Sequence, residues 1–390
     1  MIQSATRGFR LRLFSVAAMA LGACVRPAHS DIFERNARLS RGVNFGNVLE
    51  APKEGDWGLT LKEEYFKLVA EAGFKSVRIP IKWSAHAGAA APYAIDAGFL
   101  ARIDWAVAQS LKYGLAPVIN IHHYDEMFTD PANHKARWLG LWKQIAEHFK
   151  DQPEDVYFEL LNEPNSALTM ALWNQYLVEG LSAIRASNPT RAVVVGPSDW
   201  NGIWRLKDLA LPSADRNLIV TVHFYDPFHF THQGADWAEG SAAWLGTKWG
   251  SQADQDAVVK SLGEAKTWGA ANQRPIFMGE FGSYGKADMA SRALWTRFVA
   301  RTAEKAGFSW AYWEFGSGFG VYDPAASKWR PELKDALLGD VIGIRPIAAH
   351  RARAVGRRVW LDGAGMAQGV VVTGAKGGWT DLRGRPVVVE

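Results

Sequence analysis

The chain has 390 residues, of which 48% are hydrophobic and 22% charged, a composition that predicts a folded protein with a sizeable core and excludes wholesale disorder. The formal net charge is +4, but the excess of Lys and Arg lies in the two flanks, residues 1–30 and 345–390. The body between the flanks is mildly acidic, which argues against a nucleic-acid partner because such a partner needs a basic surface.

The first 30 residues have the pattern of an export signal. A cluster of arginines precedes an apolar run at 13–23 that is too short to span a bilayer. The Leu-Gly-Ala-Cys sequence at 21–24 resembles a bacterial lipobox, which would be cleaved before Cys24 and make it a lipid anchor. The Ala-His-Ser sequence at 28–30 resembles an ordinary signal-peptidase site, and the sequence does not decide between these two cleavage sites. We expect export from a bacterial cytoplasm to an extracellular, cell-surface or periplasmic location.

From residue 40 onward, short apolar runs alternate with amphipathic stretches. The runs are nearly continuous in hydrophobicity, as expected of parallel strands buried on both faces. Eight strands are predicted, at Gly42–Gly46, Ser76–Ile81, Ala116–Ile121, Val156–Leu161, Ala192–Gly196, Leu218–Val222, Pro275–Gly279 and Phe308–Tyr312. Helices are predicted between them at Leu61–Ala72, Phe99–Tyr113, Lys135–Phe149, Leu168–Ser187 and Ala290–Lys305.

Eight strand–helix units in one series predict an α/β fold, a single (β/α)8 TIM barrel over residues 31–344. A doubly wound sheet is disfavoured because the first predicted strand is not followed by a glycine-rich phosphate loop and a helix. Residues 345–390 form a basic, Gly-rich extension, a short β-rich tail. Strands are predicted in it at Val359–Leu361, Gly369–Val372 and Val387–Val389.

In TIM barrels the chemistry gathers where the strands end. All eight predicted strands end in polar or aromatic residues. Charged groups on buried strands are costly unless they are paired, so their gathering at one mouth predicts a functional site. In chain order these residues are Asn44, Asn47, Glu50, Arg78, His122, His123, Asn162, Glu163, Asp199, Trp200, His223, Tyr225, Glu280 and Trp313.

Two glutamates, Glu163 and Glu280, end the fourth and seventh predicted strands. A pair of carboxyls across a barrel mouth can act as acid/base and nucleophile in glycoside cleavage, about 5 Å apart in a retaining enzyme. That chemistry needs one carboxyl protonated and the other ionised. Arg78 and Tyr225 would lower the pKa of a neighbouring carboxylate, and Asn162 offers amide donors to a sugar hydroxyl. An ordinary loop role for each glutamate is the alternative.

A metal site is the other chemistry that these residue types allow. The first strand lacks the His-x-His pair with which barrel metallohydrolases begin, and adjacent histidines on a strand point to opposite sides. The sequence therefore favours a site without a metal or another cofactor. The candidate zinc ligands that this argument disfavours are His122, His123, Asp125, Glu126, His223, His229 and His232.

The chain holds 18 tryptophans, and indole faces beyond the needs of a core favour stacking on sugars, bases or lipid headgroups. Trp310, inside the last predicted strand, is expected in the core. Trp313 ends that strand, where its ring would form a platform for a sugar. Trp200, Trp237 and Trp249 fall in loops and either line a cleft or pack on the body.

These motifs together resemble glycoside hydrolase family 5, the cellulase family. Phe158–Pro164, which reads Phe-Glu-Leu-Leu-Asn-Glu-Pro, resembles the acid/base signature of the family, and Ile276–Gly282 is similar to its nucleophile strand. The resemblance covers about residues 41–342. Further markers in the order of the family are Val77–Pro80, Asn120–Tyr124, Val222–Tyr225 and Trp310–Trp313.

The resemblance implies a retaining endo-β-1,4-glucanase that needs no metal. Glu163 would be the general acid/base and Glu280 the nucleophile, oriented and ionised by Arg78 and Tyr225. Asn162 would bind the 2-hydroxyl of the sugar at the point of cleavage.

The resemblance also implies residues that contact the substrate. His122 and His223 would line the cleavage subsite above Trp313, whose peptide bond to Glu314 is expected to be cis. Further substrate contacts are implied for Asn47, Glu50, His123, His232 and Trp237. Two loops around these residues look most like bacterial endoglucanases that also accept mannans.

A β-1,4-mannanase or glucomannanase with the same catalytic pair is therefore the alternative, and a carbohydrate-binding protein is the alternative without catalysis. The implied partner is a β-linked polysaccharide or oligosaccharide. No protein partner is implied, and a monomer is expected.

Overall fold

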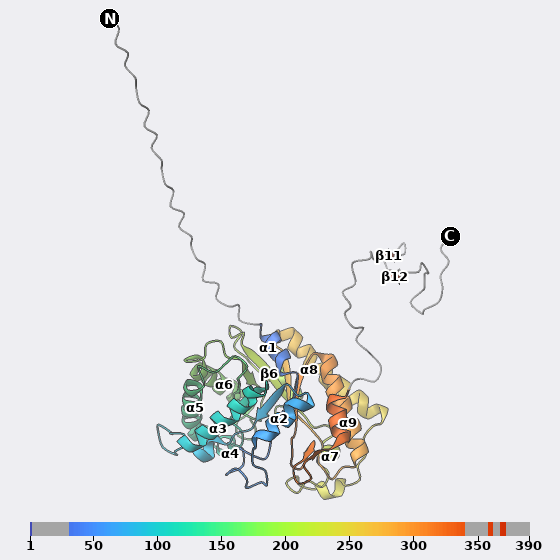
Figure 1. The fold of residues 1–390 in the computed structure, drawn as a ribbon, viewed down its shortest axis with the longest axis horizontal. Coiled ribbons are helices and arrows are strands. Elements are labelled where there is room, and N and C mark those ends of the chain that lie inside the picture. The colour runs from blue at the N-terminus through green and yellow to red at the C-terminus, as the bar shows by residue number, and fades with distance from the viewer. Residues whose placement is uncertain (2–30, 340–357, 362–366, 372–390) are drawn as a thin grey trace. The chain divides into compact units, whose positions relative to one another are not determined.

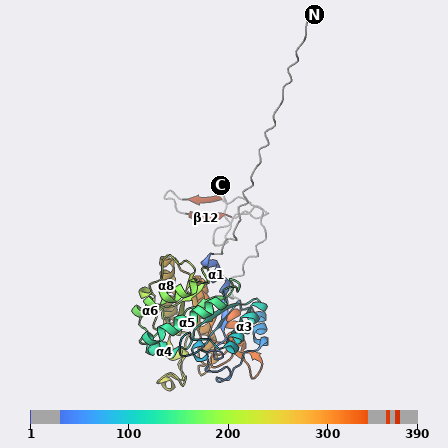
Figure 2. The same cartoon turned by 90° about the vertical axis from the view of Figure 1, so that its left-hand side faces the viewer.

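The computed structural model describes Met1 and residues 31–339, 358–361 and 367–371. The chain divides into two compact units, Met1–Gly339 and Asp340–Glu390. The first unit holds a closed barrel of eight parallel strands in sequence order, ringed by helices (Figures 1 and 2), which confirms the predicted TIM barrel. The strands are β1 Arg41–Asn44, β2 Ser76–Ile79, β3 Ala116–Asn120, β4 Tyr157–Glu159, β5 Val193–Val195, β6 Leu218–Phe224, β7 Ile276–Phe281 and β8 Ser309–Tyr312.

All five predicted helices are present. They are α2 Glu63–Ala72, α3 Ala97–Lys112, α5 Pro131–His148, α6 Met170–Arg185 and α9 Met289–Ala306. The shorter elements in the described part of this unit are α1 Ile32–Leu39, α4 Asp125–Thr129, α7 Phe228–Thr231, α10 Pro331–Leu338, the 3-10 turns η1 Trp83–His86, η2 Ile203–Asp208 and η3 Ser241–Trp244, and the strand pair β9 Tyr322–Asp323 and β10 Lys328–Trp329.

The long helix α8, Gln252–Asn272, was not predicted from the sequence. Its buried positions are Val258, Leu262, Ala265 and Gly269, which follow helical spacing but include two of the smallest residue types. A stripe that narrow gives little periodic signal. The clearest sign of the helix is its capping box, in which Ser251 and Asp254 bond each other's backbone.

The interior of the barrel is apolar at one end and polar at the other. Ile32 and Leu39 of α1, which precedes β1, pack with inward-facing strand residues such as Val118, Val194 and Phe277. Toward the carboxyl ends of the strands the buried side chains become polar, with Asn44, Arg78, Asn120 and Glu159 fully enclosed. The closed sheet therefore carries its polar groups to the mouth where the site was predicted.

The second core lies between the strands and the surrounding helices. It is rich in tryptophan: Trp83, Trp138, Trp142, Trp173, Trp295 and Trp310 are all fully buried. Trp310 thus lies in the core as expected, and its ring packs edge-on against Phe281. Gly180 of α6 lets this layer close, because a Cβ placed there would lie 2.3 Å from the Trp138 ring.

The described part of the second unit is one antiparallel hairpin, β11 Arg358–Leu361 and β12 Ala367–Val371. Two of the three predicted tail strands are therefore confirmed, and the third, Val387–Val389, lies outside the described residues. The predicted export signal and Cys24 also lie outside them. Within the described part of the chain, no helix combines the length and hydrophobicity needed to cross a membrane.

Two glycine-to-alanine substitutions test this packing. Gly180→Ala should lower the free energy of unfolding by about 1–3 kcal/mol, because the added methyl overlaps the Trp138 ring. Gly263→Ala in α8 is the matched control, since no atom lies within 4 Å of its added Cβ. It should raise the free energy of unfolding by roughly 0.5–1 kcal/mol through helix propensity. Denaturant midpoints measure both, and equal effects would contradict the packing described.

Candidate active site

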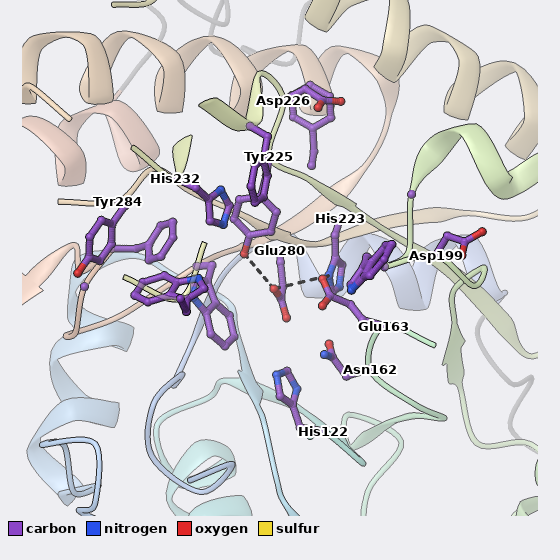
Figure 3. Close-up of a pocket in the computed structure, with 18 of the residues that line it drawn as sticks. His122, Asn162, Glu163, Asp199, His223, Tyr225, Asp226, His232, Glu280 and Tyr284 are labelled. Carbon is purple, nitrogen blue, oxygen red and sulfur yellow. Dashed lines mark hydrogen bonds and ion pairs between the residues drawn. The ribbon is translucent and has the colours of Figure 1, made fainter. Parts of the chain in front are cut away.

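A cavity of about 1310 Å³ opens at the carboxyl ends of the barrel strands. Figure 3 shows residues from several strands converging on it. Of the residues predicted to take part in catalysis or substrate binding, eleven line its wall: Asn47, His122, His123, Asn162, Glu163, His223, Tyr225, His232, Trp237, Glu280 and Trp313. Arg78 lies beneath the wall, and Glu50 lies behind it.

Glu163 and Glu280 face each other across the floor of this cavity. One oxygen of each carboxylate and one ring nitrogen of His223 lie within 4.8 Å of one another. That separation fits the ~5–5.5 Å of retaining carboxyl pairs and is shorter than the ~6.5–9.5 Å of inverting pairs. The spacing predicted from the sequence is confirmed.

The pairing of β6 and β7 brings these groups together. The register shifts between Val222 and His223, after which His223 lies beside Glu280. A bulge of this kind turns side chains locally. Here His223 Nδ1 lies 2.6 Å from Glu163 Oε1 and 3.6 Å from Glu280 Oε2. The histidine therefore lies close to both carboxyls, which Figure 3 labels, and is within hydrogen-bond distance of Glu163.

Glu280 is held by two further groups. Arg78 Nη1 donates to its Oε1 at 2.7 Å, and the Tyr225 hydroxyl donates to its Oε2 at 2.9 Å. Burial raises the pKa of the Glu280 carboxyl, while His223, Arg78 and the Tyr225 hydroxyl oppose that rise. Both oxygens of the carboxylate are thus fixed by donors, which orients Glu280 and favours its ionised form.

Arg78 is fully buried and donates to four side chains. Its Nε and Nη2 fork onto the Glu159 carboxylate at 2.5 and 2.8 Å. The remaining donors reach Glu280, Asn44 and Asn162. Burial alone would lower the pKa of Arg78, but the Glu159 and Glu280 carboxylates raise it. The guanidinium therefore stays charged beneath the site.

Glu159 is a site residue that sequence reasoning missed. It lies inside the Phe158–Pro164 motif, but its role depends on its fully buried pairing with Arg78 across the barrel. The signal available in the sequence was an acidic residue within a buried strand, which is costly without a cationic partner.

Glu163 has a different environment from Glu280. Burial raises the pKa of its carboxyl to about 7, with Arg78 opposing the rise. Its backbone is left-handed, with φ of 44°, and its carbonyl accepts a hydrogen bond of 2.7 Å from Asn165 Nδ2. A carboxyl with a pKa near neutrality can donate a proton and take it back, as an acid/base residue must.

Trp313 forms one wall of the cavity. Its ring lies against Gly46, where a Cβ would come within 2.8 Å of the indole. His122 lies parallel to that ring, with centroids 5.8 Å apart. The Trp313–Glu314 peptide bond is cis, as expected. The six-membered ring of the indole therefore lies against Gly46, and the side chain lines the cavity.

Other aromatic rings extend the wall. Trp200 and Trp237 line the cavity and are 56% and 60% exposed, as expected of platforms. Trp57 and Trp204 also line it and were not singled out from the sequence. Trp249 is buried and packs against Phe298, so it is a core residue rather than part of the cleft.

The prediction that Glu50 contacts substrate is wrong. Glu50 is fully buried, and its carboxylate accepts the backbone N–H groups of Asn47 and Val48. Burial raises its pKa to about 8, and these two hydrogen bonds oppose the rise. Glu50 instead holds the turn that presents Asn47, whose φ is 63°, to the cavity.

His123 and His232 both line the cavity, and the ring of each packs against another aromatic side chain. The His123 ring packs edge-on against Trp57, and the His232 ring stacks on Phe228 with centroids 4.0 Å apart. Burial lowers the pKa of both imidazoles to about 4. They are therefore neutral rings that can accept or donate hydrogen bonds without adding charge.

Glu163, His223 and Glu280 form the group of potential metal ligands found among the described residues. Their donor atoms already bond one another, and Arg78 places a permanent positive charge 2.7 Å from Glu280. That charge repels a second cation. A bound metal would also break the hydrogen bonds of His223 to Glu163 and of Arg78 and Tyr225 to Glu280. Two of the histidine and acid candidates lie elsewhere, since His229 stacks on Trp244 and Asp125 pairs with Lys82.

A TIM barrel with this carboxyl pair at its mouth has the architecture of a retaining glycoside hydrolase. The family model described as Cellulase, glycosyl hydrolase family 5, matches residues 40–318. The chain belongs to this family.

Individual relatives agree. The chain is 38% identical over 317 residues to Endoglucanase H of Acetivibrio thermocellus. The match covers 80% of this chain but 34% of that protein, so the chain spans about a third of the length of this relative. Cel5A of Thermotoga maritima, solved with mannotriose and with cellobiose, is 52% identical with a TM-score of 0.78, over 79% of this chain and 100% of that one. A cellulose synthase subunit Z of Clostridioides difficile is 36% identical with a TM-score of 0.75, over 77% of this chain and 99% of that one.

Proposed function

We propose that the protein is a retaining endo-β-1,4-glucanase that hydrolyses internal bonds of glucan polysaccharides by double displacement. The observation that carries the proposal is the pair Glu163 and Glu280, with oxygens within 4.8 Å and unlike surroundings. The endoglucanases among the similar proteins support the substrate class.

In the first step the Glu280 carboxylate attacks the anomeric carbon while Glu163 gives its proton to the glycosidic oxygen. The bond to the leaving chain breaks, and a glycosyl ester forms on Glu280. Arg78 and Tyr225 hold both oxygens of the nucleophile, so the attack costs little reorientation. Asn162 lines the cavity, and its side-chain amide would donate to the 2-hydroxyl of that sugar.

In the second step water attacks the same carbon, and Glu163, now ionised, takes the proton from the water. The ester bond to Glu280 breaks, and the sugar leaves with its original configuration. The raised pKa of Glu163 suits both steps, because a group that titrates at about 7 gives and accepts a proton near neutrality.

Glu280→Ala should abolish hydrolysis, since it removes the carboxylate that attacks the anomeric carbon in the proposed first step. Added azide fits the vacated space and should restore part of the activity, giving a glycosyl azide of inverted configuration. Product NMR measures the outcome. Glu179→Ala, at an exposed ion pair with Lys135, is the control and should keep its activity. Near-normal activity of Glu280→Ala without azide would end the assignment.

The pH dependence tests the role of Glu163. Because its protonated form is the acid, kcat/KM on β-glucan should fall as the pH rises through about 7. In Glu163→Gln the decline of kcat/KM at alkaline pH should disappear. The rate on glucan should fall about 10²–10⁴-fold, and the rate on aryl glycosides with good leaving groups should fall much less. If the decline of kcat/KM at alkaline pH were unchanged in Glu163→Gln, the titrating group would be a residue other than Glu163.

A β-mannanase or glucomannanase activity at the same carboxyl pair is the second candidate. The observation that favours it is the mannotriose complex of the similar Thermotoga maritima enzyme. The two hexoses differ in one hydroxyl orientation, so one site can accept both. Product analysis on carboxymethylcellulose, barley glucan, glucomannan and xylan, side by side, separates the candidates.

We also propose that the protein is exported, with residues 1–30 as its signal, and that it acts as a monomer on polysaccharide outside the cytoplasm. The support is the arginine-rich start and short apolar run of the sequence. Cys24 is the lipid anchor if the lipobox is used.

A further inference from the structure

The segment after β5 is conformationally unusual. Asp199, Trp200 and Asn201 follow one another with φ of 59°, 59° and 55°, all in the left-handed region. Each residue other than glycine costs on the order of 1–2 kcal/mol there, and such residues normally occur singly. Strain of this kind is kept where the surroundings enforce it, often beside a functional group.

This strained segment is hydrogen-bonded to two neighbours of the acid/base residue Glu163, namely Pro164 and His223. The Trp200 N–H donates to the carbonyl of Pro164, which follows Glu163, at 3.3 Å. The His223 N–H donates to the carbonyl of Asn201 at 3.0 Å. The Asn201 side chain is fully buried, and its Nδ2 lies 3.2 Å from His223 Nε2.

Gly196 makes room for the Asn201 amide. A Cβ at that glycine would lie 2.1 Å from Asn201 Oδ1 and 2.6 Å from its Cγ. Asn201 Oδ1 has no hydrogen-bond partner among the described residues, whereas its nitrogen faces the imidazole. The contact with His223 is therefore the polar interaction through which this buried side chain acts.

The amide orientation determines the tautomer of the imidazole. An amide nitrogen only donates, so His223 Nε2 must accept and the ring proton must lie on Nδ1. Burial lowers the pKa of His223 to about 4, which leaves the ring neutral with one proton. Nδ1–H then donates to Glu163 Oε1 at 2.6 Å. The reverse amide orientation would need a proton on Nε2 and would set the Nδ1 lone pair against that oxygen.

We propose that Asn201 is a positioning residue that fixes the Nδ1–H tautomer of His223, so that Glu163 carries its catalytic proton on Oε2. Oε1 is occupied as the acceptor from the imidazole in both steps. Oε2 is then the oxygen that donates to the glycosidic oxygen and later takes the proton from water. The step rests on the proposed glycosidase function, but the tautomer is a property of the resting protein.

The direct test is the tautomer itself. Nitrogen-15 spectra of the full chain with labelled histidine distinguish a protonated from an unprotonated ring nitrogen, with His223→Asn assigning the signals. We expect Nδ1 of His223 to carry the proton in the unaltered protein. A proton on Nε2 would overturn the proposal without the need for any Asn201 variant.

Two substitutions test the consequence. Asn201→Leu keeps the approximate size and removes the donor, and Gly196→Ala displaces the amide by steric overlap. Both should lower kcat about 10–100-fold on glycosides with poor leaving groups, with KM little changed and a smaller loss on activated aryl glycosides. Asn201→Asp replaces the donor by an acceptor and should move the ring proton to Nε2.

Asn272→Leu is the matched control, because Asn272 lies at the exposed end of α8 and bonds only the carbonyl of Trp268. It should leave the tautomer and the leaving-group dependence unchanged. Asn201→Leu with an unaltered tautomer and unaltered leaving-group dependence would overturn the proposal. A protein that hydrolyses no β-glycan would instead refute the proposed function, while the tautomer measurement would still stand or fall alone.

Discussion

The site depends on one buried cation. Arg78 has no contact with solvent, so its charge must be balanced inside the barrel, and Glu159 and Glu280 supply that balance. Desolvating these charges is costly, and removing Arg78 would leave Glu159 and Glu280 without their shared cation. The arrangement ties the fold to the proposed chemistry, because the guanidinium that pairs with Glu159 inside the barrel also orients the Glu280 carboxylate and favours its ionised form.

The second glutamate is governed by a different constraint. Glu163 touches His223 rather than the guanidinium, and burial leaves its pKa at about 7. Glu163 and Glu280 thus face each other with different partners, an imidazole beside Glu163 and a guanidinium and a phenol hydroxyl beside Glu280. The register shift of β6 against β7 places His223 beside Glu280, and the turn at Asp199–Asn201 is hydrogen-bonded to the backbone of Pro164 and His223.

The barrel and the meeting of Glu163 and Glu280 at its mouth could be predicted from the sequence, because both depend on simple signals. Buried parallel strands give continuous apolar runs, and the polar residues that follow them must meet at one mouth. The same logic failed where the signal was weak or non-local. The buried positions of helix α8, Val258, Leu262, Ala265 and Gly269, give little periodic signal, and the Glu50 carboxylate accepts hydrogen bonds from its own loop instead of lining the cavity. The roles of Glu159 and Asn201 depend on partners distant in sequence, Arg78 and His223.

The central claim is that Glu280 attacks the sugar while Glu163 supplies and recovers the proton. Incubation with a 2-deoxy-2-fluoro cellobioside bearing a good leaving group tests it most directly, since the fluorine slows the second step and lets the ester accumulate. Peptide mass spectrometry should find the fluorinated disaccharide on Glu280, and only trace labelling in Glu280→Ala. A label on a different residue, or an active enzyme that never forms an ester, would contradict the account.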